Sequence, residues 1–282
     1  MKTTLLFLSV FLTTSLFGQN VYIPDANFKA LLVAVSQINT NDDTEIQVSE
    51  ASAYDGILVL NDENISDLTG IEAFTALTFL VCSYNLLTSL DVSQNTALTT
   101  LDCRYNQLTS LDVSQNTALG TLQCPGNQLT SLDVSQNIAL ESLWCVSNQL
   151  TSLDVSQNTA LNELLCHYNQ LTCLNVANGN NINMNYSFQF WAANNPNLTC
   201  IEVDNVAFST ANWTNIDPQT SFSEDCNNDC STSTVGITEL TSSKTLIQIL
   251  DLMGRKTTFK PNTPLIYVYD DGSTEKVFSV EY

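Results

Sequence analysis

Hydrophobic and polar positions follow a strict period through the middle of this chain. The twelve-residue block LTSLDVSQNTAL stands at 87–98, 108–119 and 150–161, and it recurs at 129–140 with Ile138 in place of a threonine. The copies start 21 residues apart, and the nine-residue segments between them repeat leucine, cysteine and asparagine. Apolar and polar residues alternate within each half, which predicts short strands with one face turned inward. A fixed period of this length predicts a solenoid of stacked turns.

Two parallel strand ladders are expected on opposite walls of a narrow coil. Leu101 and Cys103 should point inward on one wall, and Leu90 and Val92 on the other. An asparagine stands where each turn changes direction, and its amide can bond exposed backbone groups. These asparagines are Asn85, Asn106, Asn127, Asn148 and Asn169. A single turn cannot bury its own apolar face, so both ends of the coil need caps.

The repeat resembles the leucine-rich repeat family, in its bacterial class with a 21-residue period, over about 57–205. Residues 57–76 are more similar to an internalin repeat, since Ile65, Leu68, Ile71 and Phe74 continue its apolar spacing. The resemblance implies a mainly β solenoid, a leucine-rich repeat coil with two parallel strand ladders. A helical N-terminal cap over 19–56, a C-cap with linker over 206–234 and a small C-terminal β domain over 235–282 complete the expected organisation.

The predicted N-terminal cap contains a possible calcium loop. Its helix would bury Phe28, Leu31, Leu32 and Val35 on one face. Oxygen-bearing residues then stand at positions 1, 3, 5, 7 and 12 of an EF-hand loop: Asn39, Asn41, Asp43, Glu45 and Glu50. Asn39 replaces the usual leading aspartate, and Thr44 stands where the loop requires glycine. The alternative is a helical cap that keeps the loop shape without metal, and the resemblance to internalins, whose N-caps are EF-hand-like but truncated, favours that cap.

The nine cysteines fall into two groups. Five lie 21 residues apart at one inward repeat position: Cys82, Cys103, Cys124, Cys145 and Cys166. They would form a line with ~4.8 Å steps, whereas a metal cluster needs ligands that converge on one point. A column of buried thiols is therefore expected, with disulfides between neighbours as the alternative. Among the other four, Cys200 and Cys226 could close the C-cap as a disulfide, with Phe208 and Trp213 covering the last open core.

The net charge of the chain limits its binding partners, and its N-terminus indicates where the protein is located. The chain has 8 Lys+Arg against 29 Asp+Glu, a net charge of −21, which excludes a basic nucleic-acid interface. Residues 1–18 have the order of a signal peptide, with an apolar run from Leu5 to Leu12 that is too short to span a bilayer. We expect an exported protein without a transmembrane segment, secreted or attached to the outer cell surface.

The tail differs from the rest in charge and in pattern. Residues 1–243 hold three basic and 24 acidic side chains, whereas 244–282 hold five of each. Three strands are predicted at 245–251, 264–270 and 275–281, the last two joined by a hairpin at Asp271-Gly272. The run from Asp251 to Arg255 and the final Lys276-Val277-Phe278 resemble C-terminal sorting domains of type IX secretion. That resemblance implies the type IX export machinery as a partner; the alternative is an accessory β domain.

Residues that vary between otherwise constant repeats indicate where a ligand would bind. They occupy outward positions of the nine-residue segments, on the side that leucine-rich repeat proteins use for binding, and they include the Trp, Tyr and Arg side chains enriched at binding hot spots. The candidate contacts are Val81, Tyr84, Asp102, Arg104, Tyr105, Gln123, Trp144, Val146, Leu165, His167 and Tyr168. The sequence therefore predicts a binding module for a protein or a glycan.

Two further observations concern other possible functions: an acidic column on the opposite wall and the absence of catalytic motifs. Asp91, Asp112, Asp133 and Asp154 form one outward column whose repulsion bridging cations could relieve. A structural, surface-layer or adhesion protein with cation-dependent stability and no specific ligand is the alternative function. The one histidine, His167, should diverge from its inward neighbour Cys166. No phosphate loop, nucleophile elbow or zinc signature occurs, so we expect neither catalysis nor a cofactor other than the possible calcium.

Overall fold

The computed structural model describes residues 18–227, 230, 246–251, 255–258, 265–269 and 274–277. The chain forms two compact units, Met1–Thr232 and Ser233–Tyr282. Most of the expected signal peptide and parts of the tail motifs lie outside the described residues, namely 1–17, 252–254, 270–273 and 278–281. No helix among the described residues is long and apolar enough to cross a membrane.

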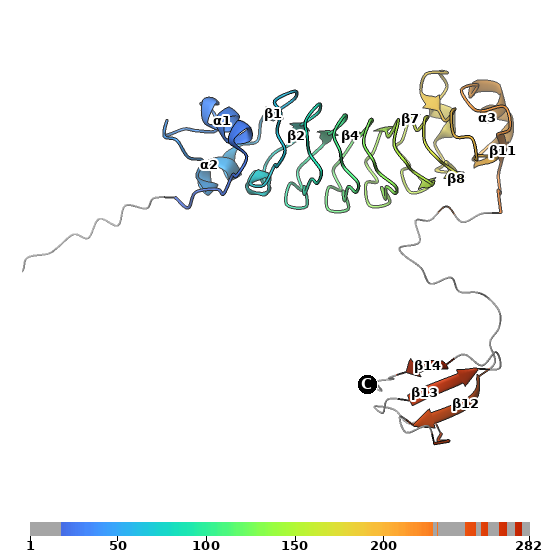
Figure 1. Ribbon diagram of the computed structural model, residues 1–282. Coiled ribbons are helices and arrows are strands. Elements are labelled where there is room, and N and C mark those ends of the chain that lie inside the picture. Colours follow the sequence, from blue (N-terminus) through green and yellow to red (C-terminus); the bar gives the residue numbers. More distant parts are fainter. Residues whose placement is uncertain are drawn as a thin grey trace, which may run out of the picture. The chain divides into compact units, whose positions relative to one another are not determined.

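The first unit is a solenoid of parallel strands, whose turns stack side by side in Figure 1. One wall is a seven-stranded sheet in the order β1-β2-β3-β4-β5-β7-β9. Its strands are β1 (Ile57–Val59), β2 (Phe79–Val81), β3 (Thr100–Asp102), β4 (Thr121–Gln123), β5 (Ser142–Trp144), β7 (Glu163–Leu165) and β9 (Phe190–Trp191). Leu101 pairs with Leu80 on one side and with Leu122 on the other, each 21 residues away. The predicted stacking of successive turns is thereby confirmed.

The second wall is regular only in the C-terminal half of the solenoid. It contains β6 (Ser152–Asp154), β8 (Cys173–Asn175), β10 (Cys200–Glu202) and β11 (Ser221–Ser223) in one parallel sheet. Earlier turns of the described chain contribute a single bridge, between Asp91 and Asp112. Because the blocks at 87–98 and 150–161 are identical in sequence, the difference depends on position in the stack and not on local propensity. The second ladder is thus shorter than the first.

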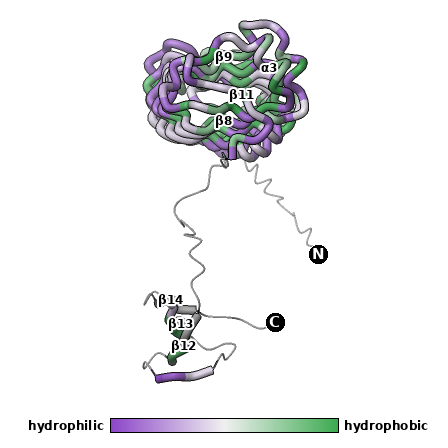
Figure 2. Tube along the Cα trace, turned by 90° about the vertical axis from the view of Figure 1, so that its right-hand side faces the viewer, coloured by the Kyte–Doolittle hydropathy of each residue, from purple (hydrophilic) through white to green (hydrophobic). Residues whose placement is uncertain are grey.

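The apolar core runs along the axis of the coil, and Figure 2 shows hydrophobic positions on the strands of both walls around that axis. Leu101, Cys103 and Val92 are fully buried, as predicted for the two walls. Leu90 is only half-buried, whereas its counterpart Leu153 is fully buried.

Helices cover the N-terminal end of this core. Helix α1 (Ala26–Ala34) begins at Asp25, whose carboxylate accepts the backbone N–H groups of Asn27 and Phe28, and it buries Phe28 and Leu32. Helix α2 (Val48–Ala53) begins with a capping box between Gln47 and Glu50. A 3-10 turn, Ile71–Ala73, lies in the first solenoid turn.

The C-terminal end is covered by helix α3 (Val206–Asn212) and the aromatic residues around it. Trp213 is 1% exposed and stacks on Phe190 with ring centroids 4.0 Å apart, while Phe208 meets it edge-on at 6.3 Å. A second 3-10 turn, Asn181–Asn183, precedes β9. Phe208 and Trp213 therefore occupy the capping positions expected from the sequence.

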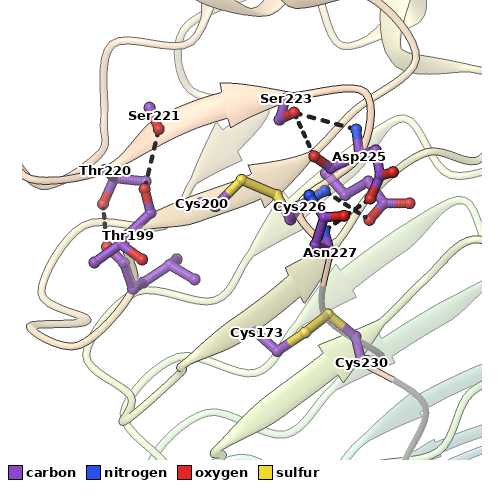
Figure 3. Close-up of a disulfide and its surroundings, with 12 residues drawn as sticks. Cys173, Thr199, Cys200, Thr220, Ser221, Ser223, Asp225, Cys226, Asn227 and Cys230 are labelled. Carbon is purple, nitrogen blue, oxygen red and sulfur yellow. Dashed lines mark hydrogen bonds between the residues drawn. A yellow bond between two sulfur atoms is a disulfide. The ribbon is translucent and has the colours of Figure 1, made fainter.

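Two disulfides tie this end together (Figure 3). Cys200–Cys226 is the pair suggested by the sequence. Cys173–Cys230 links residues 57 apart, and the spacing of the cysteines does not indicate this pair. The first joins the edge of β10 to the chain that leaves β11, and the second joins the start of β8 to Cys230.

The second unit is a three-stranded antiparallel sheet in the order β12-β13-β14. Its strands are β12 (Leu246–Asp251), β13 (Leu265–Tyr269) and β14 (Thr274–Val277). The three strands predicted for the tail are present, and the last two pair as a hairpin. The Asp271-Gly272 turn itself lies outside the described residues.

Candidate ligand-binding face

The outward side chains of the seven-stranded sheet form one continuous row. Val81 pairs in register with Asp102, and the row continues through Gln123, Trp144 and Leu165 to Trp191. Neighbouring members stand on adjacent strands, about 4.8 Å apart along the sheet. The structure thus brings the variable residues of successive repeats together on one wall.

A ladder of buried asparagines holds the backbone of this wall. Asn106 donates from Nδ2 to the carbonyl oxygens of Cys82 at 3.0 Å and Cys103 at 3.1 Å, and its Oδ1 accepts the N–H of Leu87 at 3.0 Å. Each asparagine therefore joins its own turn to the preceding one. The same pattern recurs at Asn127, Asn148, Asn169 and Asn195. The predicted role of the turn asparagines is confirmed.

Just before each ladder asparagine the chain adopts a left-handed conformation that presents a side chain to solvent. Tyr84, Tyr105 and Tyr168 have φ of 55°, 52° and 56° and are 52%, 48% and 56% exposed. Tyr84 stacks on Tyr105 with centroids 4.6 Å apart. The Tyr105 ring in turn lies over Gly126, where an added Cβ would be 2.5 Å from Tyr105 Cδ1. The ring pair therefore depends on the missing side chain at Gly126.

An ion pair occupies the polar centre of the row. Arg104 Nη2 lies 2.8 Å from Asp102 Oδ2, and the backbone N–H of Arg104 donates to Asp102 Oδ1 at 3.2 Å. Asp102 is only 5% exposed, because Arg104 covers it. Asp102 stays a predicted contact, and in this structure its buried carboxylate holds the half-buried Arg104 in place.

Trp144 is held by a carboxylate that sequence reasoning missed. Its Nε1 donates to Glu163 Oε2 at 2.8 Å, and Ser142 Oγ donates to the same oxygen at 2.6 Å. The signal was present in the sequence, since Glu163 stands where earlier repeats have Thr100, Thr121 and Ser142. A carboxylate at a position that carries a hydroxyl in those repeats indicates that Glu163 has a role particular to this turn, which is to hold Trp144.

An aromatic stack closes the C-terminal end of the row. His167 lies against Trp191 with ring centroids 4.3 Å apart and an interplanar angle of 18°, and Tyr168 is 5.4 Å from His167. Burial lowers the pKa of His167, so the ring is neutral at neutral pH. The inward Cys166 is fully buried, so the two side chains diverge as expected. Trp191 was missed because the spacing of the ladder lengthens from 21 to 26 residues between Asn169 and Asn195.

The remaining candidates supply surface between these contacts. Val81, Gln123, Val146 and Leu165 are each half-buried on the same wall. All the predicted contact residues therefore lie on one face, and the structure adds Glu163 and Trp191 to them.

The opposite wall relieves its charge locally. The carboxylate of Asp91 accepts the backbone N–H of Ser93 at 2.9 Å, and Asp112 does the same with Ser114. These hydrogen bonds lower the pKa of both aspartates. Within the described ranges, no group of three or more His, Cys, Asp or Glu side chains is placed to hold a metal ion. This wall gives no specific support to the cation-stabilised structural protein considered above.

The EF-hand-like loop uses its oxygens on protein donors. Glu50 Oε1 accepts the N–H groups of Thr40 at 2.8 Å and Asn41 at 3.3 Å, and its Oε2 accepts that of Gln47 at 3.0 Å. Burial raises the pKa of Glu50, but these hydrogen bonds outweigh that effect, and its pKa is lowered. Glu50 therefore closes the loop as a charged carboxylate.

Three of the other four predicted calcium ligands are also engaged by protein donors. Glu45 forms an ion pair with Lys29 at 2.6 Å. Asn41 and Asp43 each accept the backbone N–H two residues further on, while the buried Oδ1 of Asn39 has no hydrogen-bond partner. The five residues share one loop, and in this conformation four of them already use their side-chain oxygens on protein donors. Calcium binding stays an untested alternative to the metal-free cap.

The cysteine column is a row of buried thiols. Cys82, Cys103, Cys124, Cys145 and Cys166 are all fully buried and free. Burial raises the pKa of each thiol, that of Cys166 to about 12. The column therefore contributes to packing, and its thiols are not poised as nucleophiles.

Comparison with known proteins finds similarity to leucine-rich repeat proteins. Residues 29–158 match the family described as the leucine-rich repeat domain of the endo-β-N-acetylglucosaminidase EndoS. A segment of 77 residues is 38% identical to Internalin J of Listeria monocytogenes serotype 4b (strain F2365). That segment is 27% of this chain and 8% of the relative.

Solved structures show the same fold over a longer stretch. The functional domain of InlJ from Listeria monocytogenes, whose description includes a cysteine ladder, is 34% identical with a TM-score of 0.54. The match covers 76% of this chain and 47% of that one. An internalin, InlF, from L. monocytogenes strain 4b F2365 has the same fold at 22% identity, with a TM-score of 0.51 over 72% of this chain and 58% of the other. The chain thus spans about half the length of these solved relatives.

Proposed function

We propose that this chain, a leucine-rich repeat protein of the internalin type, is a non-catalytic binding protein whose ligand lies on the seven-stranded face. The observation that carries the proposal is the contrast between the walls. One repeats the same polar residues, whereas the other changes its outward residues from turn to turn on a constant backbone. Variation confined to one side of a rigid scaffold is what a specific binding surface requires.

A protein is the ligand that the chemistry of this face favours. Exposed tyrosines, the half-buried Trp144 and one arginine lie on this face, and these are the side chains that contribute most binding energy between proteins. The asparagine ladder fixes the backbone before binding, which reduces the entropy lost on association. A glycan, which the sequence also allowed, would use the same aromatic rings.

Export is part of the same proposal. The N-terminal signal peptide predicts passage across the inner membrane. The disulfides Cys173–Cys230 and Cys200–Cys226 suit an oxidising compartment. The tail would direct the protein to the type IX machinery, leaving the solenoid secreted or on the outer cell surface.

The test is a capture experiment with the full chain as bait against surface and host extracts. Tyr105→Ser combined with Trp144→Ser should remove the captured protein without lowering Tm by more than a few degrees. A matched control changes Gln115→Ser and Gln136→Ser, two exposed residues of the constant wall. Capture that survives the first variant and disappears in the control would assign binding to the opposite wall.

A further inference from the structure

The N-terminal end of the binding face carries an apolar patch at positions that are polar in the later repeats. The outward side chains of β1 and β2 are Ile57, Val59, Phe79 and Val81, which form a two-by-two array because Ile57 pairs with Phe79 and Val59 with Val81. We call these four residues the N-terminal patch. Ile57 is 59% and Val59 55% exposed. Later strands have hydroxyl or polar residues in the row of Ile57, so this exposure is specific to the first turns.

An acidic hollow adjoins the N-terminal patch. The hydroxyl of Tyr54 donates to the carbonyl of Ile57 at 2.8 Å, joining the patch to the cap. Glu50, Tyr54 and Asp55 line an open hollow of about 490 Å³ on the cap side of that contact. Asp55 is the exposed carboxylate of the hollow, whereas Glu50 is buried and its oxygens accept hydrogen bonds from the loop. The hollow therefore presents the negative charge of Asp55 beside exposed apolar side chains.

The charge of the solenoid restricts what can cover this surface. Between residues 18 and 227 the basic side chains are Lys29 and Arg104, and both are paired with carboxylates. The solenoid of a second copy would bring like charges together, and its residues 18–227 hold no unpaired lysine or arginine to offset them, which costs free energy across an interface. A partner with lysine or arginine beside apolar side chains has the complementary charge.

We propose that the N-terminal patch and the acidic hollow together dock a cationic amphipathic protein segment, with a lysine or arginine in the hollow and apolar side chains on Ile57 and Val59. This inference rests on the proposed function, because it names the chemistry of a partner at one end of the same face. Contiguous exposed apolar surface with a polar border is typical of protein interaction sites.

The probe is a synthetic amphipathic helical peptide of leucine and lysine, about 18 residues and so five turns long. Binding to the full chain is measured by fluorescence anisotropy at low and at physiological salt. Two peptides of equal length serve for comparison, one with glutamate in place of lysine and one with serine in place of leucine. We expect only the leucine–lysine peptide to bind, and its binding to weaken as salt rises.

Variants separate the two halves of the surface. Ile57→Ser with Val59→Ser should weaken peptide binding at least about tenfold, and Asp55→Asn should weaken it several-fold and flatten the salt dependence. The matched control is Ile138→Thr, which removes an isoleucine that is 62% exposed elsewhere and restores the threonine of the other repeats. Circular dichroism confirms that each variant is folded.

Three results would overturn the inference. They are equal binding of the leucine–glutamate peptide, full binding by the folded Ile57→Ser/Val59→Ser variant, and a wild-type dimer in sedimentation that this variant abolishes. The last would assign the patch to a second copy. The peptide-binding experiment could fail while Tyr105→Ser/Trp144→Ser still abolishes capture. The proposed function would then still hold, because those two residues lie outside the N-terminal patch.

Discussion

Gly126 shows how one residue sets the shape of the binding face. Its turn has the same left-handed conformation as Tyr84, Tyr105, Ser147 and Tyr168, so the backbone tolerates other residues there at a cost of ~1–2 kcal/mol. What glycine adds at this position is the space for the Tyr105 ring. The nine-residue segments place glycine and tyrosine in the same column, but only the structure shows that one makes room for the other.

Gly126→Ala should therefore disturb Tyr105 more than it disturbs the backbone. The new Cβ would meet Tyr105 Cδ1 at 2.5 Å, displacing that ring and its stack on Tyr84. We expect a fall in stability of about 2 kcal/mol and a reduced near-ultraviolet tyrosine signal. Gly179→Ala is the control, since Gly179 also has positive φ (77°) but no atom within 4 Å of the added Cβ. Equal tyrosine signals in the two variants would contradict this role.

The ladder asparagines make a second prediction at this scale. Asn127→Ala would strand the buried N–H of Leu108 in the preceding turn. It would also remove one of two hydrogen bonds from each of the carbonyls of Cys103 and Cys124, which keep Asn106 and Asn148 as donors. A stranded buried group costs roughly 1–3 kcal/mol, so urea denaturation should show a loss of at least that size. The neighbouring exposed Gln128→Ala should change the midpoint little. A small effect at Asn127 would mean that water replaces the ladder.

The stability of the N-terminal cap depends on the titration of Glu50. Hydrogen bonds from the loop hold the pKa of Glu50 below the ordinary value of a glutamate, so the folded state favours the ionised carboxylate more strongly than the unfolded chain does. This stabilisation is complete above the unfolded pKa and is lost as pH falls through the lowered folded pKa. Glu50→Gln should lower Tm at pH 7 and narrow its difference from the wild type near pH 3. A constant difference across that range would show that the charge is irrelevant.

The same element allows a direct test of calcium. Because the oxygens of Glu50 and Glu45 are engaged by protein donors, millimolar calcium should leave the Tm of the wild-type chain unchanged. A rise in Tm that Glu50→Gln abolishes would show instead that the loop rearranges to release its carboxylates.

The cysteine column is predicted to be inert in the folded protein. Its five thiols are fully buried and have raised pKa values, so an alkylating reagent at pH 8 should modify none of them without denaturant. All five should react in urea, as counted by mass spectrometry. Modification of Cys103 or Cys124 at native rates would indicate local opening of the central turns.

For the whole molecule, periodicity predicted the solenoid well because each turn contacts only its neighbours. A pattern that repeats every 21 residues then fixes the register of Leu80, Leu101 and Leu122 without knowledge of the rest. Features that do not follow the 21-residue period were harder to predict from the sequence. The five-residue expansion before Asn195 hid Trp191, and the burial of Asp102 depends on where the Arg104 side chain folds. Contacts between columns need side-chain geometry that sequence spacing does not contain.

The disulfides should stabilise the C-terminal end unequally. Cys200→Ser with Cys226→Ser opens a loop of 26 residues, and Cys173→Ser with Cys230→Ser opens one of 57. In the chain-entropy description each loss costs roughly 3–4 kcal/mol, with the longer loop about 0.7 kcal/mol greater. Denaturation of the two double variants measures both. A larger effect from the shorter loop would show that local packing around α3 outweighs loop length.

The Cys173–Cys230 bond also determines how a mechanical load would pass through the molecule. A pull on the chain beyond Cys230 is transmitted by covalent bonds straight to Cys173 in the solenoid wall. Residues 174–229, with α3, Trp213 and the second disulfide, form a closed side loop that bears no tension. If the tail tethered this protein to a surface under flow, the force would act on the stacked turns of the solenoid. The C-cap would carry no load and would stay packed on the core.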